Sequence, residues 1–372
     1  MNRKKIAVIF GTRPEAIKMA PVIKELEKHT DQFETQVIVT AQHREMLDQV
    51  LKVFDIHPHY DLNVMERNQT LSDITMKVLK GLENIFIEDK PDMVLVHGDT
   101  TTSFAAALAA YYQQIPIGHV EAGLRTYDKY FPFPEEANRQ LIDNLADLFF
   151  VPTELTKQNL IKENKPENQI FVTGNTAIDA IAFTRKLEME HPVLDKMTSD
   201  KKWILLTMHR RENQGEPMKQ VFQAVKQIVE EHPEVAIIMP VHLSPSVQAS
   251  VKEMLNGHDR ILLTQPLEVD VFHKVISKAH IVLTDSGGLQ EEAPAFDIPV
   301  LVLRDKTERP EGLEAGTLKV IGSDKNSVYR AVDELLTEQE TYNGMALAEN
   351  PYGDGTASKE IVVKINKFFS KK

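Results

Sequence analysis

Short apolar runs, rich in β-branched residues, alternate with longer amphipathic stretches along the whole chain. Nearly continuous apolar runs of this length are typical of strands that are buried on both faces of a parallel sheet. In the first half they are Ile6–Phe10, Gln36–Thr40, Met93–His97, Ile117–Val120, Leu148–Val151 and Ile170–Val172. In the second half they are Trp203–Thr207, Val235–Pro240, Ile261–Leu263, His280–Thr284, Pro299–Leu303 and Leu318–Ile321.

The stretches between these runs predict the helices that would cover such sheets. Helical spacing of apolar residues is found in Leu71–Glu88, Ser103–Gln113, Met218–Glu231 and Val328–Leu336. Strands that alternate with helices favour an α/β fold. The twelve strand candidates exceed one comfortable sheet and divide six and six, so we expect two doubly wound domains.

The domain boundary is expected between residues 174 and 202, where a polar stretch from His191 to Lys201 interrupts the alternation. A chain of 372 residues is long enough to form two cores. We predict an N-terminal domain over residues 1–175 and a C-terminal, nucleotide-binding domain over residues 176–354. A last helix at about 355–372 is expected to pack back on the first domain.

Composition and charge restrict the classes of partner and site. The net charge is −12 and no block rich in Lys or Arg occurs before the last few residues, so a nucleic-acid partner is not expected. The chain has no cysteine, which excludes disulfides, thiolate zinc sites and Cys nucleophiles and fits a reducing cytoplasm. No run of about 18 apolar residues is present, so we expect no membrane span.

Polar residues concentrate directly after the strand candidates, where open α/β sheets bind their ligands. The most informative turn is Ser286-Gly287-Gly288, which joins an apolar run to a helix-compatible stretch. Free backbone N–H groups at a helix start suit a phosphate, and glycine lets an anion approach the backbone. Glu292 lies about one helical turn further on, within reach of a sugar hydroxyl. An isolated turn of this kind would more often be an ordinary strand-to-helix connection.

Three carboxylates are candidates for acid–base chemistry. Asp99 follows a strand and precedes three threonines that can cap the next helix in its place. Glu121 follows another strand directly, so we expect partial burial and a raised pKa; an ion pair with Arg125 is the alternative. Glu135 follows the stiff segment Phe131-Pro132-Phe133-Pro134, although it could also serve only the helix dipole.

Basic groups and histidines complete the candidate chemistry. Arg13 and Lys18 would flank a helix start and could hold a phosphate, or they could be solvated charges. His209 also follows a strand and could be a proton donor, a phosphate ligand or a structural residue. Fingerprints of a dinucleotide cofactor, a P-loop, a serine hydrolase or a helical metal site are absent from the sequence, so no metal or cofactor is expected.

Taken together, these motifs closely resemble the non-hydrolysing bacterial UDP-N-acetylglucosamine 2-epimerases. The resemblance extends from Phe10–Ala16 to Asn350–Gly355 and includes His97–Thr100, His119–Arg125, His209–Asn213, Thr284–Gly288 and Glu308–Gly312. It implies the glycosyltransferase-B fold, in which two Rossmann-like domains face a cleft. It also implies a cytoplasmic homodimer that interconverts UDP-GlcNAc and UDP-ManNAc and supplies surface polysaccharides such as teichoic acid linkage units.

The family mechanism implies a role for each matching residue. UDP leaves C1 by anti elimination to give 2-acetamidoglucal, and UDP then adds back while a proton reaches the opposite face of C2. The resemblance places Asp99, Glu121, Glu135 and His209 at this chemistry, with the assignment of acid and base left open. It places Arg13, Ser286, Gly287 and Gly288 at the phosphates, Glu292 at the ribose, Phe272 at the uracil, and Lys18, Arg139 and Arg309 as supports.

The resemblance also implies regulation, because several family members need UDP-GlcNAc as an activator in a second pocket. The matching residues are Gln42, Gln69, Arg210 and His242, with Glu135 between the two sites. The chain departs from those members at Asn68, where they carry an arginine, although Arg67 is adjacent. An arginine can clamp a phosphate with two donors and an asparagine cannot, so this departure weakens the expectation of tight activator binding.

Three other functions compete with this interpretation. A retaining glycosyltransferase of the same fold would need an acceptor groove. A hydrolysing epimerase would release free ManNAc. A nucleotide-sugar sensor would not need Asp99, Glu121 and Glu135 together.

Overall fold

The fold is given by a computed structural model that describes residues 3–41, 44–66, 69–307 and 309–370. Its contacts divide the chain into two compact units. Unit 1 comprises Met1–Ala182 and Tyr352–Lys372, and unit 2 comprises Phe183–Pro351. No helix within the described ranges is long and apolar enough to cross a membrane.

The boundaries between the two units in the sequence lie a few residues from the expected positions, 175/176 and 354/355. Helix α7 (Thr176–Thr184) has most of its length in unit 1 because Asp179 joins it to the start of α16 (Ala357–Ser370). The Asp179 carboxylate accepts hydrogen bonds from the backbone N–H groups of Ala357 at 3.2 Å and Ser358 at 2.8 Å. Residues 352–372 therefore return to unit 1.

Within the described ranges, unit 1 contains a seven-stranded, entirely parallel sheet in the order β3-β2-β1-β4-β5-β6-β7. Its strands are β1 (Lys4–Phe10), β2 (Phe33–Val39), β3 (Tyr60–Asp61), β4 (Met93–His97), β5 (Ile117–Val120), β6 (Leu148–Val151) and β7 (Ile170–Val172). The central strands β4 and β5 are buried at every residue, which fits their mostly apolar sequences.

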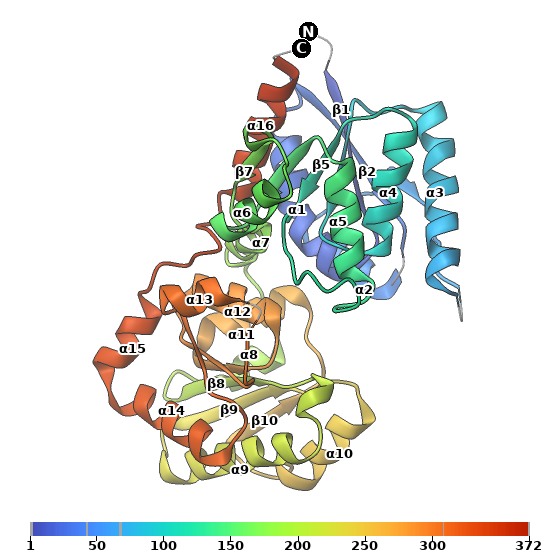
Figure 1. Ribbon diagram of the computed structural model, residues 1–372. Helices are drawn as coiled ribbons and strands as arrows, with labels where there is room; N and C mark the ends of the chain where they lie inside the picture. The colour runs from blue at the N-terminus through green and yellow to red at the C-terminus, as the bar shows by residue number, and fades with distance from the viewer. Residues whose placement is uncertain (1–2, 42–43, 67–68, 308, 371–372) are drawn as a thin grey trace. The chain divides into compact units, whose positions relative to one another are not determined.

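Helices cover both faces of this sheet (Figure 1). The others in unit 1 are α1 (Arg13–Glu27), α2 (Arg44–Val53), α3 (Leu71–Glu88), α4 (Thr101–Tyr112), α5 (Glu135–Leu145), α6 (Glu154–Lys162) and the 3₁₀ turn η1 (Glu167–Gln169). Helices α3, α4 and α5 lie side by side and share one apolar core with β1, β4 and β5. Helix α1 packs against α2 and α16.

Unit 2 repeats this architecture with a six-stranded parallel sheet in the order β10-β9-β8-β11-β12-β13. Its strands are β8 (Lys202–Thr207), β9 (Val235–Pro240), β10 (Ile261–Thr264), β11 (Ala279–Thr284), β12 (Val300–Val302) and β13 (Leu318–Val320). Its helices are α8 (Pro192–Lys196), η2 (Arg211–Asn213), α9 (Glu216–Glu231), α10 (Pro245–Met254), α11 (Val269–Lys278), α12 (Gly287–Glu292), η3 (Ala293–Phe296), α13 (Pro310–Ala315), α14 (Lys325–Thr337) and α15 (Gln339–Ala346).

The predicted α/β fold with two doubly wound sheets is confirmed, whereas the division of strands into six and six is wrong. The described residues of unit 1 include one further strand, β3, which is only two residues long and carries no apolar run. Helix α3 has the predicted bounds, and α4, α9 and α14 begin two or three residues earlier than predicted because polar capping turns precede their apolar stretches.

The strand order reverses once in each sheet, between β1 and β4 in unit 1 and between β8 and β11 in unit 2. Ligands of open α/β sheets bind beyond the carboxyl ends of the strands at such a reversal. The turns that follow these four strands are therefore where a functional site is expected in each unit.

Candidate active site

One buried carboxylate joins the turns that follow β1 and β4 in unit 1. Glu15 is 2% exposed, and its Oε2 accepts the N–H groups of Gly11 at 3.0 Å and Thr12 at 2.8 Å. Its Oε1 accepts the hydroxyl group of Thr100 at 2.7 Å and lies 2.8 Å from the hydroxyl oxygen of Ser103. Sequence reasoning missed this role of Glu15, although its spacing from Thr12 is that of a capping box.

Glu121 lies at the centre of a compact cluster beyond β5. Its backbone adopts a positive φ of 64°, and its side chain is 12% exposed. The carboxylate pairs with the ammonium group of Lys18 and lies 3.6 Å from Nε2 of buried His97. A Cβ atom placed on Gly98 would lie 3.9 Å from Glu121 Oε1, so the cluster borders the turn after β4.

The prediction that Glu121 has a raised pKa is wrong. Burial does raise the pKa of this carboxyl, but the charges of Lys18 and His97 lower it more, and the net value is well below the usual one. The alternative ion pair with Arg125 is also not formed, because Arg125 pairs with Asp143 at 2.7 Å and Glu163 at 2.6 Å. Glu121 is therefore an ionised group at neutral pH, which suits a proton acceptor.

Asp99 makes hydrogen bonds through both its side chain and its backbone. Arg139 Nη2 lies 2.5 Å from Asp99 Oδ2, and Asn138 Nδ2 donates to the Asp99 carbonyl at 2.9 Å. The cap of α4 is Thr100, whose hydroxyl accepts the N–H of Ser103 at 3.0 Å. Asp99 is thus not needed as a cap, and its carboxylate faces a guanidinium group instead.

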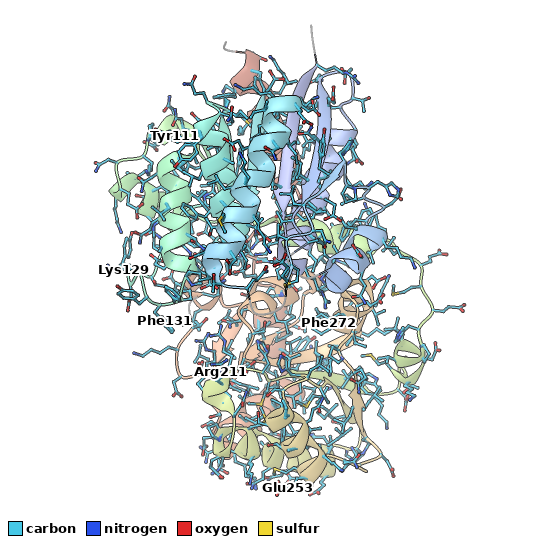
Figure 2. The ribbon with its side chains drawn as sticks, turned by 90° about the vertical axis from the view of Figure 1, so that its right-hand side faces the viewer. Tyr111, Lys129, Phe131, Arg211, Glu253 and Phe272 are labelled. Carbon is cyan, nitrogen blue, oxygen red and sulfur yellow. The ribbon has the colours of Figure 1, made fainter. Side chains whose placement is uncertain are left out.

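The two acidic residues at the start of α5 have different surroundings. Glu136 is fully buried and accepts the backbone N–H groups of Thr126 and Tyr127, each at 3.0 Å. It anchors the segment that leads through Lys129 and Phe131 to the helix (Figure 2). Glu135 is the first residue of α5 and is only half-buried. Glu136 is therefore structural, which leaves Glu135 as the candidate for chemistry.

A second buried carboxylate joins the turns that follow β8 and β11 in unit 2. Asp285 is fully buried and accepts the N–H groups of His209 and Arg210 and the Nδ2 of Asn213, each at 3.0 Å. Burial raises the pKa of this carboxyl, but the hydrogen bonds and the facing His209 ring lower it below its usual value. An ionised Asp285 therefore fixes both His209 and Arg210.

The Ser286-Gly287-Gly288 turn precedes and begins α12 and is flanked by two arginines. A Cβ atom placed on Gly287 would lie 3.8 Å from Arg210 Nη2 and 3.9 Å from Arg309 Nη2. Arg210 Nε donates to the Asp285 carbonyl at 3.0 Å, and Arg309 pairs with buried Glu291. Two oriented guanidinium groups beside a glycine turn suit an anion with several oxygen atoms, such as a diphosphate.

The residue predicted for the ribose, Glu292, lies next to this turn. A Cβ atom placed on Gly288 would lie 3.6 Å from Glu292 Oε1. Buried His273 lies with its Nε2 3.8 Å from Glu292 Oε2, and its Nδ1 is 2.7 Å from the hydroxyl of Thr184. Phe272 precedes His273 on α11 and is half-buried (Figure 2).

The predicted activator residues are distributed over both units. Gln42, Asn68 and Arg67 lie outside the described residues, and so does Glu308 of the sequence motif. Gln69 in unit 1 accepts the N–H of Glu66 at 3.1 Å. In unit 2 the His242 ring stacks on His209 with centroids 5.8 Å apart. Arg210, predicted for the activator pocket, lies beside the glycine turn predicted for the phosphates.

The structure thus groups the predicted residues by unit. The residues at the strand ends of unit 1 are Arg13, Lys18, Asp99, Glu121, Glu135 and Arg139. Those of unit 2 are His209, Arg210, His242, Phe272, Ser286, Gly287, Gly288, Glu292 and Arg309. Sequence reasoning missed the positioning roles of Glu15, His97, Asp285 and His273. The signal for Glu15 was its capping-box spacing from Thr12, and His97 and Asp285 were polar residues at or next to a strand end. His273 lies inside α11 and gave no such signal. Among the described residues, no three His, Asp or Glu side chains are arranged to hold a metal ion.

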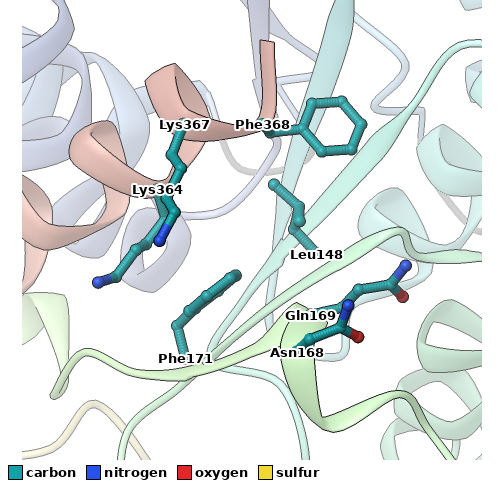
Figure 3. A pocket seen from close by; sticks show the side chains of 7 residues that line it. All are labelled: Leu148, Asn168, Gln169, Phe171, Lys364, Lys367 and Phe368. Carbon is teal, nitrogen blue, oxygen red and sulfur yellow. The ribbon is translucent and has the colours of Figure 1, made fainter. Parts of the chain in front are cut away.

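A hollow elsewhere in unit 1 has a different character. It has a volume of about 170 Å³ and is lined by Leu148, Asn168, Gln169, Phe171, Lys364, Lys367 and Phe368 (Figure 3). Leu148 begins β6, and Asn168 and Gln169 precede β7, so this hollow lies at the amino ends of the strands. Ligands of open α/β sheets bind at the opposite ends, so it is not the expected active site.

Comparison with known proteins gives one consistent family. Residues 24–366 match the family described as UDP-N-acetylglucosamine 2-epimerase. A protein of that name from Bacillus subtilis is 55% identical over 98% of this chain and 96% of its own length. A crystal structure of UDP-GlcNAc 2-epimerase from Neisseria meningitidis bound to UDP-GlcNAc is 48% identical, with a TM-score of 0.87 and coverage of 98% of this chain and 100% of that one. A glycosyltransferase structure from Rickettsia africae is only 13% identical but has a TM-score of 0.61 over 100% of both chains, which shows the shared fold.

Replacing Lys18 by methionine is expected to raise the pKa of Glu121, because it removes the charge that lowers this pKa most. In the wild type the folded-state pKa lies below the unfolded one, so the pair stabilises the fold above the unfolded pKa. This stabilisation is lost as the pH falls through the lowered folded value. In Lys18→Met the free energy of unfolding at pH 7 should fall by about 3 kcal/mol, and its dependence on pH below neutrality should weaken.

Urea unfolding of the full chain at a series of pH values measures this difference. Lys319→Met is the matched control, because Lys319 pairs with Glu334 on the surface of unit 2. The control should keep the wild-type pH dependence. The same pH dependence in Lys18→Met as in the wild type would show that Lys18 does not hold Glu121 ionised.

Proposed function

The chain belongs to the UDP-N-acetylglucosamine 2-epimerase family, and from this membership we propose that it interconverts UDP-GlcNAc and UDP-ManNAc. One structural observation carries the proposal. Glu121, which is ionised, and Asp99, which pairs with Arg139, follow neighbouring strands of one sheet. Binding alone does not require carboxylates kept ionised in this way. The bound UDP-GlcNAc in the Neisseria meningitidis relative supports the choice of substrate.

The proposed reaction is an elimination followed by an addition. The hydrogen on C2 of the sugar is not acidic, so its removal must accompany the departure of UDP from C1. A base takes this proton, the C1–O bond breaks with its electron pair going to UDP, and a C1–C2 double bond forms in 2-acetamidoglucal. UDP then adds back to C1 while a proton is delivered to the other face of C2. No cofactor is needed, because no net oxidation takes place.

The groups of unit 1 fit the proton transfers. Removal and return of a proton on opposite faces of C2 need two different acid–base groups, which we draw from Asp99, Glu121 and Glu135. Lys18 and Arg139 pair with two of these carboxylates, so we assign them to positioning and charge control. This differs from the phosphate-binding role that the sequence suggested for Lys18.

The groups of unit 2 fit the leaving group. UDP departs more readily when the developing charge on its phosphates meets oriented donors. We assign the diphosphate to Ser286, Gly287 and Gly288 with Arg210 and Arg309. In the same proposal, Glu292 binds the ribose and Phe272 binds the uracil. His209 donates a proton to the diphosphate. A phosphate-binding role for Arg13 is proposed on the resemblance alone. The product would supply the synthesis of a cell-surface polysaccharide.

Incubation of the full chain with UDP-GlcNAc alone, followed by proton NMR, tests the proposed reaction. UDP-ManNAc should accumulate without free sugar and without an added acceptor. Free ManNAc with UDP would indicate a hydrolysing epimerase. Turnover only after addition of an acceptor would indicate a glycosyltransferase, and binding without turnover would indicate a sensor.

The substitutions Asp99→Asn, Glu121→Gln and Glu135→Gln should each lower kcat by about 100-fold or more, because each removes an acid–base group and keeps the size of the side chain. UDP affinity, measured by calorimetry, should stay close to that of the wild type. Glu334→Gln on α14, where Glu334 pairs with Lys319, is the control and should be fully active. Near-normal turnover in all three variants would refute the catalytic assignment.

We further propose that the chain forms a homodimer through the outer face of α3 and α4. Met76, Tyr111 and Tyr112 are 61%, 56% and 63% exposed there (Tyr111 is labelled in Figure 2). Met76 and Tyr112 border a groove of about 460 Å³ whose lining also includes Leu79 and Ala109. Large apolar side chains gathered on one face mark an interaction surface. A second copy of the chain fits it, since a twofold contact joins one such face to itself.

The double substitution Met76→Lys with Tyr112→Lys should convert the dimer into a monomer, because four lysines would face each other across a twofold interface. Sedimentation velocity measures the change. Leu347→Lys is the control, since Leu347 is also exposed but belongs to unit 2. A double variant that still sediments as a dimer would exclude this face.

Activation by UDP-GlcNAc is proposed on the resemblance alone, through Gln42, Gln69, Arg210 and His242. Conversion of pure UDP-ManNAc should then be slow at first and should accelerate at once when a trace of UDP-GlcNAc is added. Progress curves followed by NMR test this. Full-speed conversion from time zero, unaffected by added UDP-GlcNAc, would show that the chain does not use a second site.

A further inference from the structure

A fully buried histidine of unit 1 has no role in the reaction proposed above. His119 lies in β5, directly behind the turn after β4. Its Nδ1 is 2.6 Å from Asp143 Oδ1, and its Nε2 is 2.8 Å from the carbonyl oxygen of Gly98. A carbonyl oxygen can only accept, and so can an ionised carboxylate, so both ring nitrogens are donors in this arrangement.

The side of the ring that faces Asp143 is fixed by a buried network of charges. Asp143 Oδ2 lies 2.7 Å from Arg125 Nη2, and Arg125 also bonds to Glu163 at 2.6 and 2.7 Å. Burial raises the pKa of Asp143, but the His119 ring and Arg125 lower it more, so this carboxyl is ionised. The orientation of His119 is thus set by Asp143 on α5, by Glu163 directly after α6 and by Arg125 on the segment after β5.

The other side of the ring meets the backbone that carries Asp99. Three successive carbonyl oxygens at the end of β4 each accept a side-chain hydrogen bond. Ser103 Oγ bonds to that of His97 at 2.6 Å, His119 to that of Gly98, and Asn138 Nδ2 to that of Asp99 at 2.9 Å. Gly98 has a φ of +63°, which turns its carbonyl out of the sheet and toward the histidine.

We propose that His119 is a positioning residue for Asp99. By holding the Gly98 carbonyl it fixes the peptide plane from which Asp99 extends, and so fixes the carboxylate relative to the sugar. The inference rests on the proposed function, because it gives Asp99 a part in the reaction. Displacement of a reacting group by about 1 Å can cost about 100-fold in rate, so a fixed peptide plane is a catalytic requirement as well as a structural one.

Two substitutions separate the two hydrogen bonds of His119. In His119→Gln the amide nitrogen reaches about as far as Nε2, so the bond to Gly98 is kept and the bond to Asp143 is lost. In His119→Asn the amide nitrogen lies near the place of Nδ1, so the bond to Asp143 is kept and the bond to Gly98 is lost. Both variants are expected to lose some thermal stability, because each leaves a buried polar group without its partner.

The two variants should differ in turnover. His119→Asn should lower kcat by about tenfold or more with KM changed by less than about twofold, since substrate binding does not use this contact. His119→Gln should keep kcat within about threefold of the wild type even where its melting temperature is lower. Turnover that falls in His119→Gln as far as in His119→Asn, or that follows the melting temperature in both, would show that His119 only stabilises the fold.

Combination with Asp99→Asn shows whether His119 acts through Asp99. In that background His119→Asn should lower kcat by a further factor of less than about three, because the group that it positions has already been disabled. If the effects of His119→Asn and Asp99→Asn on kcat multiply in full, this inference is overturned while the proposed reaction stays intact. Normal turnover of Asp99→Asn alone would instead overturn the catalytic role of Asp99, and this inference with it.

Discussion

In each unit, a buried carboxylate joins the two turns at which the order of the strands reverses. Glu15 binds the turns after β1 and β4, and Asp285 binds the turns after β8 and β11. Parallel strands leave backbone groups without ladder partners at these ends, and a buried polar group must be satisfied. The positions of Arg13, Asp99 and His209, which belong to these turns, depend on those two side chains.

The two units carry different charged groups, and each set fits a different part of the proposed reaction. Unit 1 gathers carboxylates, and two of them pair with a lysine or an arginine. Unit 2 gathers arginines beside a glycine turn, although the chain as a whole carries a net charge of −12. An acid–base centre and an anion-binding turn are the two things that elimination of a nucleoside diphosphate requires.

The sequence was sufficient for the longer strands and for the polar turns that follow them, because both have local signatures. It was insufficient wherever the decisive partner is distant in the chain. Glu121 was expected to have a raised pKa, but Lys18, 103 residues away, lowers it. The pair of Glu121 with Arg125 was expected from helical i, i+4 spacing, but the chain is not helical at this place. β3 was missed because two residues give no pattern.

Elimination and re-addition leave an isotopic trace that binding, hydrolysis and glycosyl transfer do not. The most direct measurement is an incubation of the full chain with UDP-GlcNAc in D₂O, followed by proton NMR of both nucleotide sugars. Deuterium should appear at C2 of UDP-ManNAc and of the recovered UDP-GlcNAc, while every other carbon-bound hydrogen of the sugar is retained. Interconversion with the original hydrogen kept at C2, or no deuterium in either sugar, would contradict the proposed chemistry.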